Sequence, residues 1–504
     1  MQIEPPETAF AERYGRNEPQ VVWTTLIADL ETPVSAFLKL GGDAMSFLLE
    51  SVEDGAVRGR YSIIGLEPDL IWRSNEGTAE INRTARTKPD AFARCSDAPL
   101  QALRALISES RIALPDTLPP MAAGVFGYLG YDMVRLMEEL PASKPDRIGI
   151  PDAILVRPTI VVIFDAVKDS IAVVTPVRPE KGIDAKTALS RAIERLASVV
   201  ENLESPTKSV QPDYDDGPID VPVQSNTTPE EYKAMVRKAK EYILAGDAFQ
   251  IVLAQRFEAP FTLPPFALYR ALRRTNPSPY LYFLDFGDFA VAGSSPEILV
   301  KVSNEVVTIR PIAGTRPRGT TPQEDRTLES ELLADPKERA EHLMLLDLGR
   351  NDVGRVASIG TVKVTDQFFI ERYSHVMHIV SNVEGKLAKN RDALDALVAG
   401  FPAGTVSGAP KVRAMQIINE LEREKRSLYA GCVGYFSAAG EMDTCIALRT
   451  ALVKDGTMYV QAGAGIVADS EPELEQQECI NKAKALFRAA EEARRFASTA
   501  KRGQ

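Results

Sequence analysis

The sequence predicts an α+β fold in which large antiparallel or mixed β-sheets are flanked by helices. Short runs rich in Val, Ile, Leu and Phe recur in the first part of the chain, as in residues 46–52, 61–65 and 159–164. Runs of this length and composition are typical of strands, and helical patterns alternate with them. The chain has 504 residues, which is too many for one ordinary hydrophobic core, so two domains are expected.

Composition divides the chain at residues 202–227. This stretch is rich in Pro, Asp, Ser and Asn and has little periodic apolar content, which predicts a linker. Residues 20–200 are then expected to form an N-terminal domain and residues 228–495 a second domain.

The second domain is expected to begin with a helix. Thr228 suits the N-cap, Pro229 suits the first helical position, and Glu231 lies three residues after the cap, which completes a capping box. Strand-like runs follow at residues 249–253, 281–284 and 305–309.

Charge and cysteine usage exclude several classes of function. The chain has 59 Lys and Arg against 70 Asp and Glu, a net charge of −11, which disfavours a nucleic-acid or anionic-membrane surface. Its four cysteines lie far apart without a Cys-x-x-Cys pair, so neither a zinc site nor a disulfide framework is predicted. The N-terminus lacks a signal-peptide pattern, and no apolar run approaches the roughly 20 residues that span a bilayer. We therefore expect a cytoplasmic protein that binds neither nucleic acid nor membrane.

A glycine-rich stretch near the C-terminus precedes an acidic helix. Gly463, Ala464 and Gly465 predict a turn whose bare backbone can approach an anion closely. The helix that follows carries Glu475 and Glu478, three residues apart and so on neighbouring positions of one face. Carboxylates are hard ligands for a divalent cation, so this arrangement predicts a site that binds an acidic small molecule through a metal.

A second helix repeats the pair of carboxylates. It is expected to open at Asp335, and its Glu338 and Glu341 extend an apolar stripe formed by Leu345 and Leu348. Glu338 has an alternative role as the capping-box partner of Asp335, whereas Glu341 lies a turn further in. A set of four carboxylates favours Mg²⁺ over zinc, because Mg²⁺ prefers hard oxygen ligands.

Histidine and arginine supply further candidates. His342, His375 and His378 are the three histidines of the chain and lie close together in the sequence; a single histidine is more often structural than catalytic. Arg449 ends an apolar strand-like run, where a guanidinium needs an anion, either in a buried ion pair or in a ligand. Residues 311–317 and 401–410 read as turns of small residues, which can be plain connections or anion-binding loops.

Taken together, these segments resemble the chorismate-utilising enzymes, and among them the large component of anthranilate synthase. The matching stretches are residues 311–318, 341–345, 347–352, 401–411 and the glycine stretch with its glutamates. They occur in the family's order over residues 228–490. Residues 48–51 and 127–132 look like the family's N-terminal domain, so the fold of the chorismate-utilising enzymes is expected for the whole chain.

The resemblance implies where metal and substrate bind. Glu341 and Glu478 would hold Mg²⁺, with Glu338 and Glu475 in support, and the metal would grip the ring carboxylate of chorismate. Arg449 would pair with the enolpyruvyl carboxylate. Further residues implied to line the substrate are Gly314, Thr315, Tyr429, Gly463, Ala464, Gly465 and Lys482.

The resemblance also implies a reaction in which ammonia adds to the ring of chorismate and pyruvate then leaves, giving anthranilate for tryptophan biosynthesis. Glu297 matches the acid that protonates the departing hydroxyl, and His378 matches the histidine near the C2 proton. Thr405, in the matching stretch 401–411, and Gln250 complete the expected catalytic group.

Two positions separate the branches of the family. Relatives that add water have a lysine base where this chain has Gln250, and a neutral amide cannot deprotonate water. The 4-amino-4-deoxychorismate branch has a lysine nucleophile where this chain has Ala313. These differences favour the anthranilate branch. An aminodeoxychorismate synthase and an enzyme that releases 2-amino-2-deoxyisochorismate stay open as alternatives, and so does a non-catalytic homologue that only binds tryptophan or an amidotransferase.

The resemblance further implies a partner and an inhibitor. The chain has no recognisable glutaminase segment, so ammonia is expected from a separate glutamine amidotransferase in a hetero-oligomer. L-Tryptophan is expected to bind between the two halves of the chain and to inhibit the enzyme. The residues assigned to that site are Glu50, Ser51, Pro279, Tyr280 and Leu281.

Overall fold

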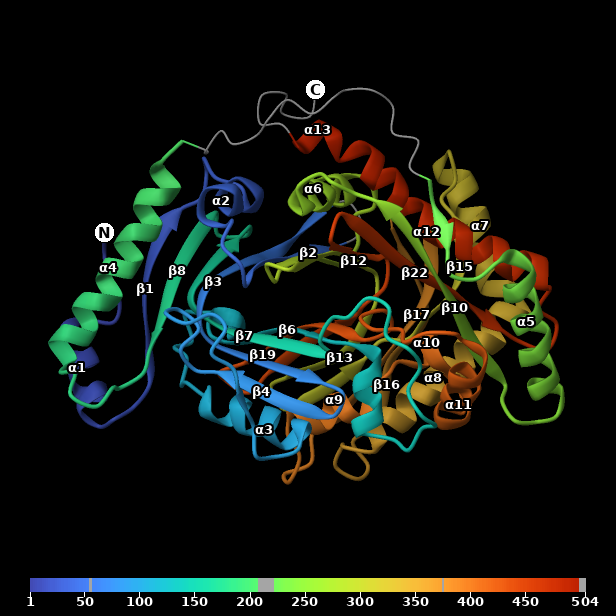
Figure 1. The fold of residues 1–504 in the computed structure, drawn as a ribbon, viewed down its shortest axis with the longest axis horizontal. Coiled ribbons are helices and arrows are strands. Elements are labelled where there is room, and N and C mark those ends of the chain that lie inside the picture. Colours follow the sequence, from blue (N-terminus) through green and yellow to red (C-terminus); the bar gives the residue numbers. More distant parts are fainter. Residues whose placement is uncertain (54–56, 207–221, 374–375, 498–504) are drawn as a thin grey trace.

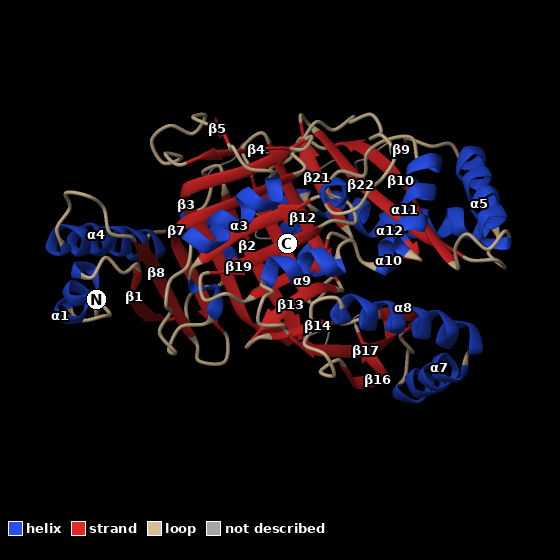
Figure 2. Ribbon diagram, turned by 90° about the horizontal axis from the view of Figure 1, so that it is seen from below, coloured by secondary structure: helices blue, strands red, loops and turns tan. Residues whose placement is uncertain are grey.

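The structure, a computed structural model, describes residues 1–53, 57–206, 222–373 and 376–497. Within that part of the chain, all strands belong to one sheet whose pairings are antiparallel (Figure 2). Helices cover the outer faces of this strongly bent sheet, as Figure 1 shows. The predicted α+β class is confirmed, and the antiparallel alternative is the one observed.

The elements fall into three groups. The strands of the first half are β1 (Gln20–Ile27), β2 (Ser46–Glu53), β3 (Val57–Asn75), β4 (Thr78–Asn82), β5 (Ala93–Arg94), β6 (Gly124–Leu129), β7 (Ala153–Asp165) and β8 (Ser170–Val177). The strands of the second half are β9 (Gln224–Ser225), β10 (Gln250–Pro260), β11 (Tyr280–Asp285), β12 (Phe289–Ser295), β13 (Ile298–Ser303), β14 (Val306–Ile309), β15 (Ile312–Pro317), β16 (Lys363–Arg372), β17 (Val376–Lys386), β18 (Gly408–Ala409), β19 (Cys432–Ser437), β20 (Met442–Ile446), β21 (Thr450–Lys454) and β22 (Thr457–Ile466). The α-helices are α1 (Glu7–Gly15), α2 (Pro33–Leu40), α3 (Pro99–Glu109), α4 (Ala185–Glu204), α5 (Pro229–Leu244), α6 (Pro265–Thr275), α7 (Pro322–Ala334), α8 (Pro336–Gly354), α9 (Ala393–Gly400), α10 (Gly404–Ser407), α11 (Lys411–Leu421), α12 (Pro472–Glu492) and α13 (Arg494–Ala497).

The two halves of the chain share the sheet through two strand pairs. β2 pairs with β11, and β6 pairs with β19, so each half contributes strands to the same hydrogen-bonded ladder. From β17 the ladder runs through β14, β13, β20 and β19 into β6, β7, β3 and β2, and returns through β11, β12, β21 and β22 to β10. The first half is thus inserted between two parts of the second.

The core has inner and outer layers. Phe47, Phe126 and Tyr282 belong to a buried cluster between the facing parts of the bent sheet. Another cluster lies under α6 and α12, which pack against each other and against β12 and β22 (Figure 1). The bent sheet is therefore held from inside by aromatic packing and from outside by helices.

Local signals in the sequence agree with several element boundaries. The Thr228 side chain accepts from the Glu231 N–H, and the Glu231 carboxylate accepts from the Thr228 N–H, so the predicted capping box at the start of α5 is confirmed. Of the predicted linker 202–227, residues 202–204 end α4 and residues 224–225 form β9, while residues 207–221 lie outside the described part. The division into domains therefore stays a prediction. Among the residues that the structure describes, no helix combines the length and the apolar character needed to cross a bilayer.

Candidate active site

The glycine-rich stretch at 463–465 lies in a strand and not in the predicted turn. Gly463, Ala464 and Gly465 form the end of β22 and pair with β10, with Ala464 opposite Leu253. The prediction of a turn is wrong because glycine also occurs in strands where another group approaches the backbone closely. A Cβ on Gly465 would lie 2.6 Å from the Gln250 amide nitrogen.

The free edge of β22 faces α12. Pairing with β21 stops at Val460, so beyond it β22 has a strand neighbour only on the β10 side. Lys482 on α12 donates to the carbonyl of Gly463 over 2.9 Å. In an antiparallel strand the N–H and C=O of one residue point the same way, and alternate residues point to the same edge. The N–H groups of Gly463 and Gly465 are therefore directed to the edge that β10 does not cover.

The two predicted carboxylate pairs lie together beside this edge. Burial, reinforced by the charges of Glu338 and Glu478, raises the pKa of Glu341. Burial and the charge of Glu478 likewise raise the pKa of Glu475. Glu341 bonds to Gln250, whose amide lies against Gly465, and Glu478 pairs with Lys482, which bonds to Gly463. α8 and α12 therefore bring these two carboxylates to the same end of β22.

Two of these carboxylates have cationic partners. Glu338 accepts from Arg316 over 2.9 Å, and Glu478 pairs with Lys482 over 2.7 Å. The predicted capping box at Asp335 is half right: Asp335 accepts from the N–H groups at the start of α8, but the Glu338 carboxylate bonds to Arg316 instead of reaching back.

The donor set suits a hard divalent cation that keeps several water ligands. Within the described residues, no three acidic, histidine or cysteine side chains converge into a closed metal cage. Mg²⁺ is commonly held by one or two carboxylates together with water and substrate oxygens. Glu341 and Glu478, which feel each other's charge, fit that open type of site.

Glu297 is a buried carboxyl group that keeps its proton. It precedes β13, and its Oε1 accepts from the Thr405 hydroxyl of α10 over 2.8 Å. Burial raises the pKa of Glu297 to about 8, although Thr405 and Arg449 act in the opposite direction. At neutral pH the group is thus mostly protonated and can act as an acid.

His378, in contrast, is a neutral imidazole. Its Nδ1 lies 3.1 Å from the carbonyl oxygen of Gly314 and 3.0 Å from the Thr315 hydroxyl. Burial, and secondarily the charge of Arg449, lowers the pKa of His378 to about 4. Because a carbonyl only accepts, the proton of the neutral ring is on Nδ1, which leaves Nε2 with a lone pair. Gly314 has φ of +78° at a bulge in β15, which places its carbonyl for this contact.

The other histidines do not join this group. His342 is fully buried in α8, where its Nε2 lies 2.6 Å from the Ser381 hydroxyl, so its role is structural. His375 lies outside the described residues.

Arg449 is positioned without an anionic partner. It connects β20 and β21 with φ of +45°, an unusual conformation for a side chain of this size. Burial lowers the pKa of the guanidinium, and among the described residues the structure shows no ion pair or side-chain hydrogen bond for it. Such a guanidinium is suited to a ligand carboxylate.

Gln250 and Tyr429 complete the predicted set. Gln250 Nε2 donates to Glu341 Oε1 over 3.0 Å, while the Gln250 carbonyl oxygen is buried without a partner in the structure. The hydroxyl of Tyr429 lies 3.0 Å from where a Cβ on Gly463 would be. Both side chains therefore approach β22 through space that its glycines leave open.

Residues before Tyr429 form an anchor that sequence reasoning missed. Arg426 donates to the carbonyl oxygens of Val252 and Val406, both over 2.7 Å, and pairs with Glu422. It thereby ties β10 and α10 to the segment that carries Tyr429. No pattern in the sequence distinguishes Arg426 from a surface arginine.

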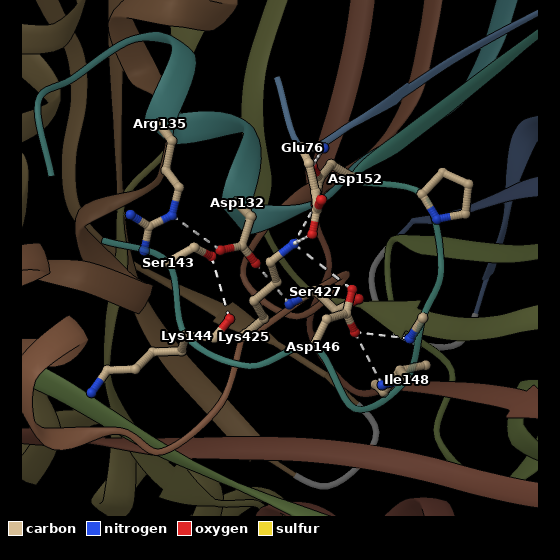
Figure 3. Close-up of polar contacts among 12 residues, drawn as sticks. Glu76, Asp132, Arg135, Ser143, Lys144, Asp146, Ile148, Asp152, Lys425 and Ser427 are labelled. Atoms are coloured by element: carbon tan, nitrogen blue, oxygen red, sulfur yellow. Dashed lines mark hydrogen bonds and ion pairs between the residues drawn. The ribbon is translucent and has the colours of Figure 1, made fainter. Parts of the chain in front are cut away.

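The same segment is fixed to the first half of the chain by an ion cluster (Figure 3). Lys425 Nζ lies 3.6 Å from Asp152 and 3.8 Å from Asp146. Asp132, in the predicted family-like stretch 127–132, accepts from the Ser427 N–H over 3.1 Å. These contacts fix the segment that carries Tyr429 to residues of the first half of the chain.

The residues predicted to bind an inhibitor line one cavity of about 740 Å³. β2 and β11 bring them together, since Ser51 is opposite Tyr280 and Glu50 is opposite Leu281. Pro279 lines the same cavity. The Glu50 carboxylate, however, accepts two hydrogen bonds from Arg273, so its charge is already paired.

Asp443 is a further residue of this cavity that the sequence did not single out. It accepts from the Tyr280 hydroxyl over 3.0 Å and lies 3.7 Å from Lys301. Burial raises the pKa of Asp443. Strand pairing places Asp443 opposite Lys301, whereas Tyr280 is on β11, which pairs with β2 and β12. The contact between Asp443 and Tyr280 is therefore made between strands that are not neighbours in the sheet, and no local pattern signals it.

Comparisons with known proteins identify relatives over nearly the whole chain. The family described as chorismate binding enzyme matches residues 67–488. Anthranilate synthase component 1 of Cereibacter sphaeroides is 57% identical over 496 residues, which cover 98% of this chain and 99% of that protein. The crystal structure of anthranilate synthase component I from Streptococcus pneumoniae is 40% identical, has a TM-score of 0.75, and covers 92% of this chain and 98% of its own. The menaquinone-specific isochorismate synthase of Escherichia coli has the same fold, with a TM-score of 0.70 at 21% identity, over 96% of this chain and 99% of its own.

Proposed function

We propose that this chain, which belongs to the family of chorismate-binding enzymes, is the large subunit of a cytoplasmic anthranilate synthase. It would convert chorismate and ammonia to anthranilate and pyruvate, the first step of tryptophan biosynthesis. The observation that carries the proposal is a buried acid and a buried base in one site: the Glu297 carboxyl group is held by the Thr405 hydroxyl, and His378 turns Nδ1 to the Gly314 carbonyl, which leaves Nε2 with a lone pair. Burial raises the pKa of Glu297 and lowers that of His378, in agreement with these roles.

Chorismate has two carboxylates, and the site has a separate partner for each. Arg449, which has no ion pair within the described part of the chain, would bind the enolpyruvyl carboxylate. The N–H groups directed to the free edge of β22 would face the substrate beside Lys482, and Tyr429 would close the site above Gly463.

The ring carboxylate would lie beside α8 and α12. Glu341 and Glu478 would hold Mg²⁺ there, supported by Glu338 and Glu475. When bound, the cation would neutralise the ring carboxylate and the charge that develops beside C2. Glu341→Gln is expected to abolish turnover without changing thermal stability by more than a few degrees, and retained turnover would refute this metal assignment.

The chain's own residues account for both proton transfers. Glu297, oriented by Thr405, would protonate the C4 hydroxyl, which leaves as water while ammonia adds at C2, and the ammonium group so formed would return one proton to Glu297. His378 Nε2 would then take the C2 proton as the bond to the enolpyruvyl oxygen breaks, which makes the ring aromatic. The departing enolpyruvate gains that proton at its methylene carbon and so becomes pyruvate.

Two side chains limit the reaction to ammonia. Gln250 is a neutral amide already bonded to Glu341, so it cannot generate hydroxide from water. Ala313 has no nucleophile for the covalent adduct of the 4-amino branch.

Ammonia would come from a separate glutamine amidotransferase subunit, and L-tryptophan would inhibit the enzyme from the cavity between β2 and β11. That cavity presents Ser51 and Tyr280 from two separate parts of the chain. A ligand there has different contacts in two arrangements of these parts, as inhibition at a distance requires.

The test uses the purified chain with chorismate, Mg²⁺ and an ammonium salt, without any partner. Anthranilate fluorescence should appear and should depend on all three. Consumption of chorismate without a fluorescent product would indicate one of the other amino branches. No consumption of chorismate by a folded chain would favour a non-catalytic homologue.

A further inference from the structure

The inhibitor cavity and the active site share a wall. Pro296 and Ile298 line the cavity, while Glu297 between them bonds to Thr405 on the other side. Tyr373, at the end of β16, is a second member of this wall: it lines the cavity and is itself 8% exposed.

Tyr373 contacts the catalytic histidine directly. Its ring packs edge-on against the His378 imidazole, with 5.5 Å between the ring centroids and 61° between the planes. Its phenol is also close enough to Arg449 for an electrostatic effect on the pKa of that guanidinium. The side chain thus lies against two of the groups assigned to catalysis and substrate binding.

On the cavity side, the Tyr373 phenol is held by an ion pair. Its hydroxyl donates to Glu371 Oε2 over 2.7 Å, and Arg310 donates to the other carboxylate oxygen of Glu371. Arg310 and Glu371 both line the cavity. Glu371 is also opposite His378 in the pairing of β16 with β17, so the backbone holds carboxylate and imidazole in register.

The backbone of Tyr373 is fixed independently of its side chain. Its N–H donates to the Val376 carbonyl over 2.8 Å, and its carbonyl accepts from Arg318 over 2.8 Å. Only the side chain is therefore left to respond when the charges in the cavity change.

We propose that Tyr373 is a positioning residue that couples the cavity to the active site, through the Arg310–Glu371 pair on one side and the His378 ring on the other. The inference rests on the proposed inhibition by tryptophan. A zwitterionic ligand in the cavity competes for the charges of Arg310 and Glu371. Release of the phenol then changes how the ring of Tyr373 packs against His378. Because coupling between two sites is reciprocal, a ligand in the active site changes the affinity of the cavity for tryptophan by the same factor.

The test measures this coupling factor directly. The dissociation constant of L-tryptophan is measured by calorimetry with Mg²⁺, with and without saturating chorismate and without ammonia, so that no anthranilate forms. The dissociation constant with chorismate divided by the constant without chorismate is the coupling factor. Tyr373→Phe keeps the ring but deletes the bond to Glu371, and is expected to bring the ratio to within twofold of one while the constant for free enzyme changes less than threefold.

Two further variants separate coupling from structural damage. Tyr242→Phe is a matched control, because it deletes an exposed hydrogen bond between Tyr242 of α5 and Glu420 of α11. Its ratio should equal that of wild type. Glu371→Ala should bring the ratio close to one, as Tyr373→Phe does. The double variant should have the same ratio as each single variant, because each of these three proteins lacks the hydrogen bond between Tyr373 and Glu371.

The outcomes distinguish a failure of this inference from a failure of the proposed function or of the proposed inhibition by tryptophan. A wild-type ratio well away from one that persists in Tyr373→Phe overturns the role of Tyr373 alone. A Tyr373→Phe variant that no longer binds tryptophan makes Tyr373 a ligand contact and overturns its role as a coupling residue. A wild-type chain that makes anthranilate but does not bind tryptophan overturns the proposed inhibition together with the inference.

Discussion

Replacing Glu297 by glutamine tests the protonation state on which the proposed chemistry depends. Glutamine keeps the size of the side chain and an oxygen that can accept from Thr405, but it has no acidic proton. Turnover should fall by at least about a hundredfold, within the range typical for loss of a positioned acid. In the wild type, a group with a pKa of about 8 changes from about 90% protonated at pH 7 to about 10% at pH 9. The acid-dependent rate should therefore drop roughly tenfold over that interval.

The same substitution should stabilise the fold. The pKa of Glu297 is raised from 4.5 to about 8 on folding. Its contribution to stability is therefore fully present below pH 4.5 and is lost as pH rises to 8. The free energy of unfolding lost by pH 7 is roughly 3 kcal/mol, and above pH 8 it is about 5 kcal/mol. Glu297→Gln does not titrate, so its thermal midpoint should exceed that of wild type by a margin that grows between pH 5 and pH 8.

The assay is thermal unfolding of wild type and variant at matched pH values, together with initial rates with ammonium as substrate. Glu305→Gln, at an exposed turn, serves as the control and should show no pH-dependent difference. A stability difference that stays constant from pH 5 to pH 8, or a variant that keeps more than a tenth of wild-type turnover, would refute the assignment of Glu297 as a protonated acid.

Three further substitutions address the ligand sites. Arg449→Gln should raise the KM for chorismate by roughly 10- to 100-fold, the usual cost of losing a charge-assisted pair, with a smaller change in kcat; an unchanged KM in initial-rate measurements would mean that the guanidinium does not bind substrate. Gly463→Ala places a Cβ 2.7 Å from the carbonyl oxygen of Leu253 and 3.0 Å from the Tyr429 hydroxyl, so chorismate binding measured by calorimetry should weaken, whereas Gly15→Ala, which meets no atom within 4 Å, should leave it unchanged. Ser51→Leu should raise the tryptophan concentration for half-inhibition while ammonium-dependent turnover is preserved, and the inhibitor assignment fails if the inhibition curve is unmoved.

Local signals in the sequence were sufficient where one short segment determines the structure. The capping box of Thr228 and Glu231 marks the start of α5 because its donors and acceptors lie within one turn. The carboxylates of α8 and α12 could likewise be predicted as pairs, since helical spacing places residues three apart on neighbouring positions.

Local sequence patterns did not predict the structure where contacts between distant segments determine it. The glycines of β22 read as a turn because their purpose, to admit Gln250 and Tyr429, is visible only once β10 and the Tyr429 segment are in place. Glu338 fits a capping box in sequence, yet its carboxylate accepts a hydrogen bond from Arg316 of β15 instead. Tyr373 and Arg426 show no pattern at all, because strand register and tertiary contacts alone bring them to the site.

The most direct test of the proposed reaction is the ratio of pyruvate formed to chorismate consumed by the purified chain with Mg²⁺ and ammonium. Glu297 and His378 in one site predict that amination and elimination are both completed there, so one pyruvate should appear for each chorismate consumed from the first turnovers. An aminated product that accumulates without pyruvate would contradict the assignment of His378 to the elimination step.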